Sequence, residues 1–338
     1  MLKLRTVLKR AAAASVAALC LLGAIASARA EAPAGAGQTV DAEALVTNQG
    51  SDSLSFVDLA TLKSVAEIKI GGKPAGIAVS ADGAKAFVTS PEGKFLTVVD
   101  VKSRTVERRI AVDGGPLGVA ANPVSGEVYV ADWYSKTLTA LDPITGAVRG
   151  RVEVGSSPSG LAVTADGALL LSADRDSDQV SIVDVASLKA ITAIPVGKRP
   201  FGITLDPSGA RAFTANVGSD DVTVVDLKTR KAVGRVPAGR LPYAIAFAGE
   251  KGFVTNQSGG TVTVFDATTL AVEKTIEVGD TPEGIAADAS GRYIYVACWF
   301  ANTLDRIDVA TLTVTGQATV GDAPRAFGNF LVQAPAGK

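Results

Sequence analysis

Short apolar runs recur along the chain after its first thirty residues, and they are separated by Gly, Asp, Asn and Ser. In one stretch the runs are GIAVS at 76–80, AFVTS at 86–90, LTVVD at 96–100 and TVERRIAV at 105–112. Short runs rich in Val, Ile, Thr and Phe between turn-forming residues are typical of buried β-strands. We therefore expect four strands in this stretch, called A to D in chain order.

The same pattern repeats along the chain. Successive copies of one proline are 42 residues apart, with a single spacing of 40, and one aspartate recurs with the same spacings. A fixed period of this length with four strands per unit is typical of the blades of a β-propeller. The prolines are Pro74, Pro116, Pro158, Pro200, Pro242, Pro282 and Pro324, and the aspartates are Asp58, Asp100, Asp142, Asp184, Asp226, Asp266 and Asp308.

The two ends of the repeat array complement each other. The first unit begins at strand B, with the run at 45–48, and lacks a strand A. The last proline is followed by the run at 325–332, which is typical of strand A and has no later strand to pair with. Pairing the two leaves no open sheet edge. The sequence therefore predicts an all-β, seven-bladed propeller of four-stranded blades, closed by the C-terminal strand A on the N-terminal strands B to D.

The first thirty residues have a different pattern. Four basic residues precede an apolar stretch at 11–25, and Ala28-Arg29-Ala30 supplies the small-residue pattern of a signal-peptidase site. The apolar stretch is shorter than the roughly 20 residues that a spanning helix needs. We expect a cleaved signal peptide at 1–30 and a periplasmic or secreted protein. A retained anchor is an alternative, whereas lipidation at Cys20 is disfavoured by the bulky Leu19 before it.

The remaining chain divides into a flexible N-terminal segment at 31–43, the propeller at 44–334 and a short tail at 335–338. Without the signal peptide it contains 28 Lys and Arg against 34 Asp and Glu. A mildly acidic protein is a poor candidate for nucleic-acid binding, which needs a clustered positive surface. The chain has no histidine, which excludes His-ligated metal sites and Ser-His or Cys-His nucleophiles.

The second strand of several units carries a recognisable phrase. It is LVTN at 45–48 and FVTN at 253–256, with the variants FTAN at 213–216, YVAD at 129–132 and YVAC at 295–298. Together with the repeated Pro-x-Gly-Ile-Ala and Val-x-Val-Asp phrases, the chain resembles the YVTN-repeat, YncE-like propellers. The resemblance implies a periplasmic or surface propeller with a binding or accessory role, and it supplies no catalytic motif.

Two groups of residues are candidates for metal binding. Asp174, Asp176 and Asp178 alternate as at the start of a calcium loop, but the glycine and glutamate that such a loop needs are missing. Cys298 is the only cysteine after the signal peptide, so no internal disulfide is possible. We predict no cofactor, with bound calcium or a transition metal as an alternative. The recurring aspartates are each followed three residues later by Thr or Ser, which indicates turns.

The variable positions gather on one face of the predicted ring. The D–A and B–C loops, which we call the loop face, differ between units, whereas the A–B and C–D turns of the opposite turn face repeat. Aromatic and Arg side chains are favoured in binding patches, although the same rings could instead cover the ends of the blades. The candidate contacts are Trp133, Tyr134, Phe201, Tyr243, Trp299, Phe300, Arg199, Arg240 and Arg325. Glu283 and Arg325, on adjoining blades, are expected to pair at the surface.

The sequence thus favours a monomeric binding or scaffold protein, whose partner is a protein or a small anionic ligand. No membrane anchor remains after signal cleavage, and no catalytic residue is assigned. One alternative is a metal-assisted, lactonase-like hydrolase at the central channel, which would depend on Asp132, Asp174 and Glu283. Another is an accessory factor of a periplasmic redox enzyme.

Overall fold

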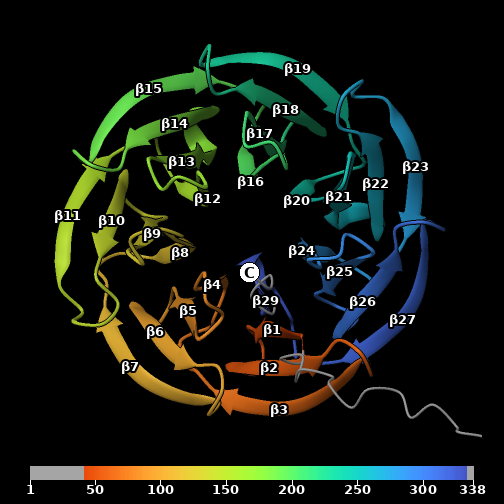
Figure 1. The fold of residues 1–338 in the computed structure, drawn as a ribbon, viewed down its shortest axis with the longest axis horizontal. Helices are drawn as coiled ribbons and strands as arrows, with labels where there is room; N and C mark the ends of the chain where they lie inside the picture. The colour runs from red at the N-terminus through yellow and green to blue at the C-terminus, as the bar shows by residue number, and fades with distance from the viewer. Residues whose placement is uncertain (1–41, 333–338) are drawn as a thin grey trace, which may run out of the picture. The chain divides into compact units, whose positions relative to one another are not determined.

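The computed structural model describes residues 42–332, which form seven sheets arranged as a ring around a central channel (Figure 1). The predicted fold class is confirmed. The predictions for residues 1–41 and for the C-terminal tail lie outside the described residues.

The first four blades run from the N-terminus in chain order. They contain β1 (Glu43–Asn48), β2 (Ser53–Asp58) and β3 (Lys63–Lys69); then β4 (Gly76–Val79), β5 (Lys85–Ser90), β6 (Phe95–Asp100) and β7 (Thr105–Ala111); then β8 (Pro116–Ala121), β9 (Val128–Asp132), β10 (Thr137–Leu141) and β11 (Val148–Glu153); then β12 (Pro158–Val163), β13 (Leu169–Asp174), the short 3-10 helix η1 (Arg175–Ser177), β14 (Gln179–Asp184) and β15 (Lys189–Pro195).

The other three blades and the closing segment follow. They contain β16 (Pro200–Leu205), β17 (Arg211–Asn216), β18 (Asp221–Asp226) and β19 (Lys231–Pro237); then β20 (Pro242–Ala248), β21 (Lys251–Asn256), the 3-10 helix η2 (Gln257–Gly259), β22 (Thr261–Asp266) and β23 (Val272–Glu277); then β24 (Pro282–Ala287), β25 (Tyr293–Cys298), β26 (Thr303–Asp308) and β27 (Thr313–Thr319); and finally β28 (Phe327–Asn329) and β29 (Leu331–Val332).

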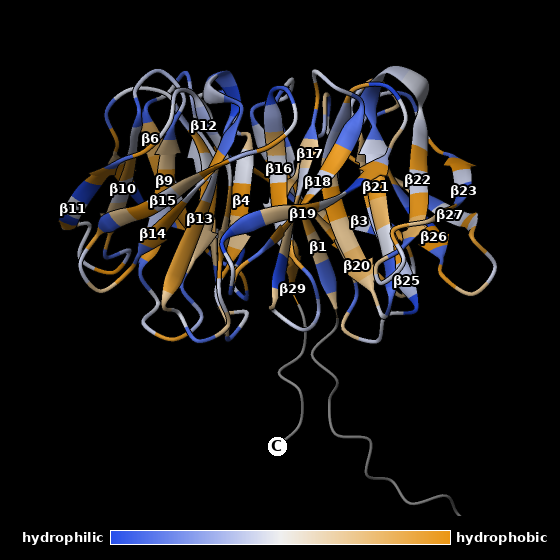
Figure 2. Ribbon diagram, turned by 90° about the horizontal axis from the view of Figure 1, so that it is seen from above, coloured by the Kyte–Doolittle hydropathy of each residue, from blue (hydrophilic) through white to orange (hydrophobic). Residues whose placement is uncertain are grey.

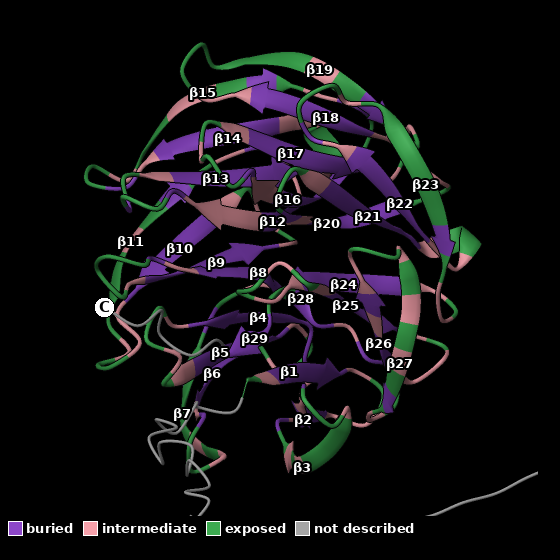
Figure 3. Cartoon of the chain, turned by 45° about the vertical axis from the view of Figure 1, so that its right-hand side comes forward, coloured by how far each residue is buried: buried purple, intermediate pink, exposed green. Residues whose placement is uncertain are grey.

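Burial of the inner strands on both faces explains why apolar and polar residues do not alternate strictly along them. Strands B and C lie between neighbouring blades, so that β5 and β6 are buried along most of their length. The outer strand D faces solvent on one side, and β7 is accordingly mostly exposed, as the rim of the ring shows (Figure 3). Apolar residues on both faces of the inner strands thus form hydrophobic clusters between neighbouring sheets.

The ring closes as the sequence predicts. β29 pairs antiparallel with β1, and the amide of Leu45 donates to the carbonyl of Phe330 at 2.8 Å. The beginning of β1 and the end of β29 therefore lie side by side, at the turn face (Figure 2). A detail that the sequence did not indicate is the parallel pairing of β28 with β4 of the adjoining blade. The C-terminal segment therefore joins two blades at once.

The A strands lie close together near the loop face, where glycine is the second residue after the repeating proline in five of the seven units. A Cβ built on Gly118 would lie only 1.7 Å from the carbonyl oxygen of Ser159 on the next A strand, so a larger residue cannot be accommodated without movement. At the turn face, the recurring aspartates accept hydrogen bonds from the Thr or Ser three residues on in all seven units, which confirms their predicted role in turns.

Candidate functional site: the loop face and its aromatic plug

The loops of this face are held in fixed conformations by hydrogen bonds between neighbouring units. Asp178 in a B–C loop and Arg199 in the next D–A loop both have positive φ, 51° and 55°. The Asp178 carboxylate accepts the amide hydrogen of Arg199 at 2.8 Å. Asp220 accepts the amide of Leu241 in the same way, at 2.9 Å. Left-handed backbone is costly for such residues, so these contacts help to fix the loops.

Beneath the loops, three aromatic rings fill the end of the channel. Phe201 packs on Tyr243 with ring centroids 4.3 Å apart and on Phe327 at 4.9 Å, and Tyr243 contacts Phe327 at 5.4 Å. All three side chains are buried. They come from β16, β20 and β28, which are brought together only when the ring closes. We call these three rings the aromatic plug.

Contacts continue from the plug to both tryptophans. The Trp133 ring lies 5.9 Å from that of Phe201 on one side. On the other side, the guanidinium carbon of Arg325 lies 5.8 Å from the centre of the Tyr243 ring and 5.5 Å from that of Trp299. A series of ring and cation–π contacts therefore joins Trp133 and Trp299 across the channel, each contact of the kind that contributes about 1 kcal/mol.

A buried polar cluster sits against the plug. Arg325 Nε lies 3.0 Å from Glu283 Oε2, and Arg325 Nη2 donates to the Tyr243 hydroxyl at 2.6 Å. Gln257 donates to the other Glu283 oxygen at 2.8 Å. Glu283 and Arg325 do form a pair, but the prediction that it lies at the surface is wrong, because the Glu283 side chain is only 6% exposed. The pair is buried because it packs against Tyr243 of the aromatic plug.

Burial and charge act in opposite directions on this cluster. Burial raises the pKa of Glu283 above its usual range, although the Arg325 charge lowers it in part. Burial alone would lower the pKa of Arg325, but Glu283 and Tyr243 raise it overall. Glu283 Oε2 is paired with Arg325 yet accepts no hydrogen bond. Because a buried pair costs desolvation, we attribute to it a role in fixing the position of Arg325.

The accessible side chains of the face surround the plug. Tyr134 is 80% exposed and Phe300 is 71% exposed, and each follows a tryptophan that is half-buried. Arg199 and Arg240 are also exposed. Within residues 42–332 neither of these two guanidinium groups has a hydrogen-bond or ion-pair partner.

The predicted contacts therefore divide into two groups. Phe201 and Tyr243 are only 6% and 3% exposed, and the Arg325 side chain binds Glu283 and Tyr243. These three side chains therefore lie beneath the loop face and stabilise it, and they are not available to contact a partner. The sequence analysis missed Phe327. The sequence could have indicated this residue, because the third residue after the repeating proline is aliphatic in the other six units and aromatic only at Phe327.

The metal candidates are occupied by other contacts. Asp174 accepts hydrogen bonds from Ser172, Ser181, Gln179 and the amide of Gly155, and burial raises its pKa despite them. Asp176 pairs with Arg175 and Asp178 with Lys198. In the part of the chain that the structure describes, no three His, Cys, Asp or Glu side chains are grouped so that they could hold a metal ion.

The carboxylates considered for hydrolysis also have structural contacts. Asp132 accepts the amide hydrogens of Gly115 at 2.8 Å and Tyr134 at 3.0 Å, and it thereby holds a D–A loop against a B–C loop. Asp174 binds Gly155 in the corresponding loop of the next blade. Glu283 belongs to the cluster around Arg325. Each of the three carboxylates thus has its own structural contacts, and the three do not share a site.

Cys298 occupies the position that Asp132 and Asp174 hold in their blades. The Cys298 side chain is buried, and burial together with the nearby Asp305 carboxylate raises its pKa well above the usual value. Asp305, one strand further out, accepts the loop amide of Gly279 at 2.8 Å in its place. The thiol is therefore a protonated packing group in the folded protein.

The described residues contain no helix with the length and hydrophobicity required to span a bilayer.

Comparison with known proteins supports the assignment of the fold. A family model described as a YNCE-like beta-propeller matches residues 24–124 and 151–335. No curated protein matches the sequence. Hydrazine synthase from Kuenenia stuttgartiensis has a similar structure, with a TM-score of 0.68, 17% identity, and coverage of 75% of this chain and 88% of that one. A functionally unknown protein from Desulfotomaculum acetoxidans has a TM-score of 0.73 and 18% identity, and the match covers 85% of this chain and 99% of that one. At these identities the likeness shows a shared fold.

Proposed function

This chain belongs to the YNCE-like β-propeller family, and we propose that it is a binding protein that holds its partner against the loop face. The observation that carries the proposal is the exposure of Tyr134, Phe300, Arg199 and Arg240 in loops of the same face. Exposed aromatic rings together with arginines that have no internal partner are the side chains that binding patches favour.

The geometry beneath the face supports this proposal. The aromatic plug fills the channel end, and Trp133 and Trp299 pack against it or against Arg325. The exposed rings of Tyr134 and Phe300 are therefore presented from loops on a rigid base. A preorganised surface loses less conformational entropy on binding than a flexible one. A folded protein partner is consequently favoured over a segment that enters the channel from this side.

Arg199 and Arg240 define the chemistry of the partner. A guanidinium group without an internal partner gains most from a carboxylate or phosphate that it can bind through two parallel hydrogen bonds. We infer that the partner presents acidic groups, on a protein surface or on a small anionic ligand, near the two D–A loops that carry these arginines.

The proposal includes export and action as a monomer without a cofactor. Export is supported by the basic, then apolar N-terminal sequence that ends in Ala28-Arg29-Ala30. Expression of the full chain in a Gram-negative host, followed by N-terminal sequencing, should yield a periplasmic protein that begins at Glu31. Retention of Met1 in the cytoplasm would contradict export, but it would leave the loop-face proposal untouched.

The binding proposal is tested by affinity capture with matched surface variants. The loop-face variant carries Tyr134→Ser, Phe300→Ser, Arg199→Gln and Arg240→Gln, all at exposed positions. The control carries Val124→Ser and Ile144→Ser, which are 69% and 79% exposed on the turn face. We expect a partner retained by the wild type and the control to be lost by the loop-face variant, with unchanged thermal unfolding. Equal retention by all three proteins would refute the proposed face.

A further inference from the structure

The central channel contains a cavity of about 680 Å³ that is separate from the loop face. The inner strands A line it from the plug to the A–B turns. Phe327 of the plug lies at one end, and the exposed turn residues Ala81, Pro123 and Pro207 lie at the other. The channel is thus closed beneath the loop face and open at the turn face.

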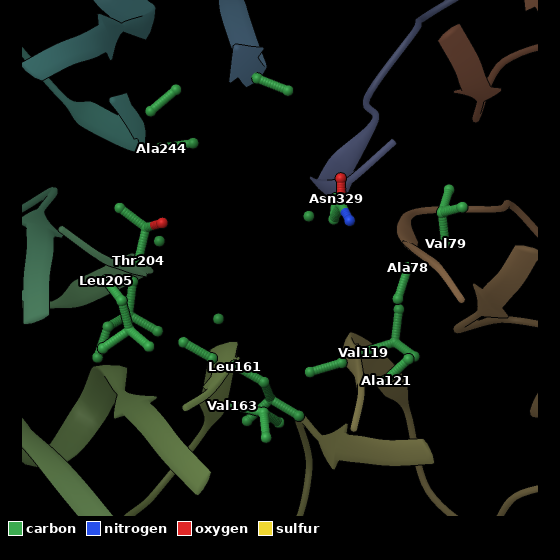
Figure 4. A pocket seen from close by; sticks show the side chains of 18 of the residues that line it. Ala78, Val79, Val119, Ala121, Leu161, Val163, Thr204, Leu205, Ala244 and Asn329 are labelled. Carbon is green, nitrogen blue, oxygen red and sulfur yellow. The ribbon is translucent and has the colours of Figure 1, made fainter. Parts of the chain in front are cut away.

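The wall of this cavity contains no charged side chain. Figure 4 shows aliphatic groups that point into the space, with Val119, Leu161, Val163 and Leu205 among them. Gly and Ala occupy many of the other lining positions and keep the cavity wide. Its volume is within the range of about 300–1,000 Å³ that is usual for small-molecule sites.

Three polar side chains interrupt the aliphatic wall, and one of them, Ser80, donates a hydrogen bond to Asp82. Thr204 on β16 and Asn329 on β28 lie on opposite sides of the cavity (Figure 4). Neither side chain makes a hydrogen bond to any residue of the described chain. A hydroxyl and an amide facing each other across an aliphatic cavity are suited to one small, uncharged hydrogen-bonding group.

The lack of a counter-charge in the cavity adds a second constraint. Aspartates lie in the turns around the opening, but several pair with basic neighbours, as Asp206 does with Arg211 and Asp100 with Lys85. An anion would lose its hydration on entering a cavity that offers no counter-charge.

We propose that the channel is a second binding site, for an uncharged molecule with an aliphatic body and a single hydroxyl or amide head. The molecule enters from the turn face, its body contacts the aliphatic wall, and its head bonds to Thr204 or Asn329. The plug prevents it from reaching the loop face, so the two sites are independent.

The experiment measures binding of three ten-carbon probes by calorimetry, with 1-decanol below its solubility limit and the two charged probes below their micelle concentrations. The protein starts at Glu31 and keeps its C-terminus. 1-Decanol should bind at least about tenfold more tightly than decanoate, because burying a carboxylate without a partner is costly. Decyltrimethylammonium should also bind more weakly than the alcohol. Tighter binding of the cation would place the site at the acidic rim and overturn the proposal.

Variants assign the binding to the channel. Thr204→Phe should abolish 1-decanol binding by filling the cavity, and Thr204→Val or Asn329→Leu should weaken it about three- to tenfold through a lost hydrogen bond. Thr275→Phe is the matched control, because Thr275 is exposed on the outer strand β23. Equal binding of 1-decanol by the Thr204→Phe and Thr275→Phe proteins would show non-specific adsorption and overturn the proposal. This outcome is independent of the capture experiment that tests the loop face.

Discussion

The hydroxyl oxygen of Tyr243 lies 2.6 Å from Nη2 and 3.0 Å from Nε of Arg325, so one buried hydroxyl accepts from two atoms of the same guanidinium. Tyr243 belongs to the sixth blade, whereas Arg325 lies on the segment that closes the ring. This contact links closure of the ring to the plug, and through the plug to both tryptophans of the loop face.

Removal of this hydroxyl should therefore destabilise the protein. We expect Tyr243→Phe to lower the free energy of unfolding by about 1.5–3 kcal/mol, the usual contribution of a hydrogen bond to a charged group. Urea denaturation measures the change. Tyr134→Phe is the control, because Tyr134 is 80% exposed and should change stability by less than about 0.5 kcal/mol. Equal effects of the two substitutions would refute the importance of the buried contact.

Removal of residues 324–338 should open the ring. The truncation deletes Phe327 and Phe330, both buried, together with the pairing of β29 with β1. Since truncation of one buried Phe costs about 3–5 kcal/mol, we expect a loss of more than about 5 kcal/mol and a much lower melting temperature. A chain that ends at Val332 keeps all of these contacts and should melt like the intact protein. Unchanged melting of the longer truncation would contradict closure by this segment.

The pH dependence of stability should reveal the buried Asp174. Burial raises the pKa of Asp174 in the folded protein above the value of 3.8 that applies to the unfolded chain. The folded state then holds the proton more tightly, so the contribution of this group to stability falls as the pH rises from about 4 through the raised pKa. Asn occupies the same position in three other blades, as Asn48, Asn216 and Asn256. We therefore expect Asp174→Asn to gain stability relative to the wild type with rising pH.

Asp184 provides a control of opposite sign for this experiment. The hydroxyl and amide of Ser187 lower the pKa of Asp184, so its contribution to stability is present above about pH 4 and is lost as the pH falls. Asp184→Asn should therefore be less stable than the wild type at neutral pH and should approach it in acid. Chemical denaturation at several pH values between about 3 and 8 measures both trends. Parallel pH profiles for the two variants would contradict the assigned environments.

The Cys298 thiol should be unreactive in the folded protein. Its burial and raised pKa leave little thiolate, which is the nucleophilic form. In protein that starts at Glu31, we expect modification by a disulfide reagent at least about a hundredfold slower than in denaturant. A Ser208→Cys variant supplies an exposed reference thiol in an A–B turn. Comparable rates at the two positions would contradict burial of Cys298.

The fold was predictable because its signals are repeated. Seven copies of a proline and an aspartate specify the blades, and the unmatched runs at 45–48 and 325–332 indicate the closure. The site was less predictable, since Phe201, Tyr243 and Tyr134 are all aromatic residues at variable positions of the repeat. Only Tyr134 is exposed, because Phe201 and Tyr243 pack against each other in the closed ring. A single sequence does not contain this contact, so it could not separate the supporting rings from the exposed ones.

The loop face itself is tested most directly by site-specific photo-crosslinking. A benzophenone amino acid is placed at Tyr134, at Phe300 or at the turn-face position Ile144, and each protein is irradiated with a captured partner. We predict covalent adducts from positions 134 and 300 and none from 144, with the crosslinked peptide of the partner rich in Asp or Glu. Adducts from 144 alone would contradict binding at the loop face.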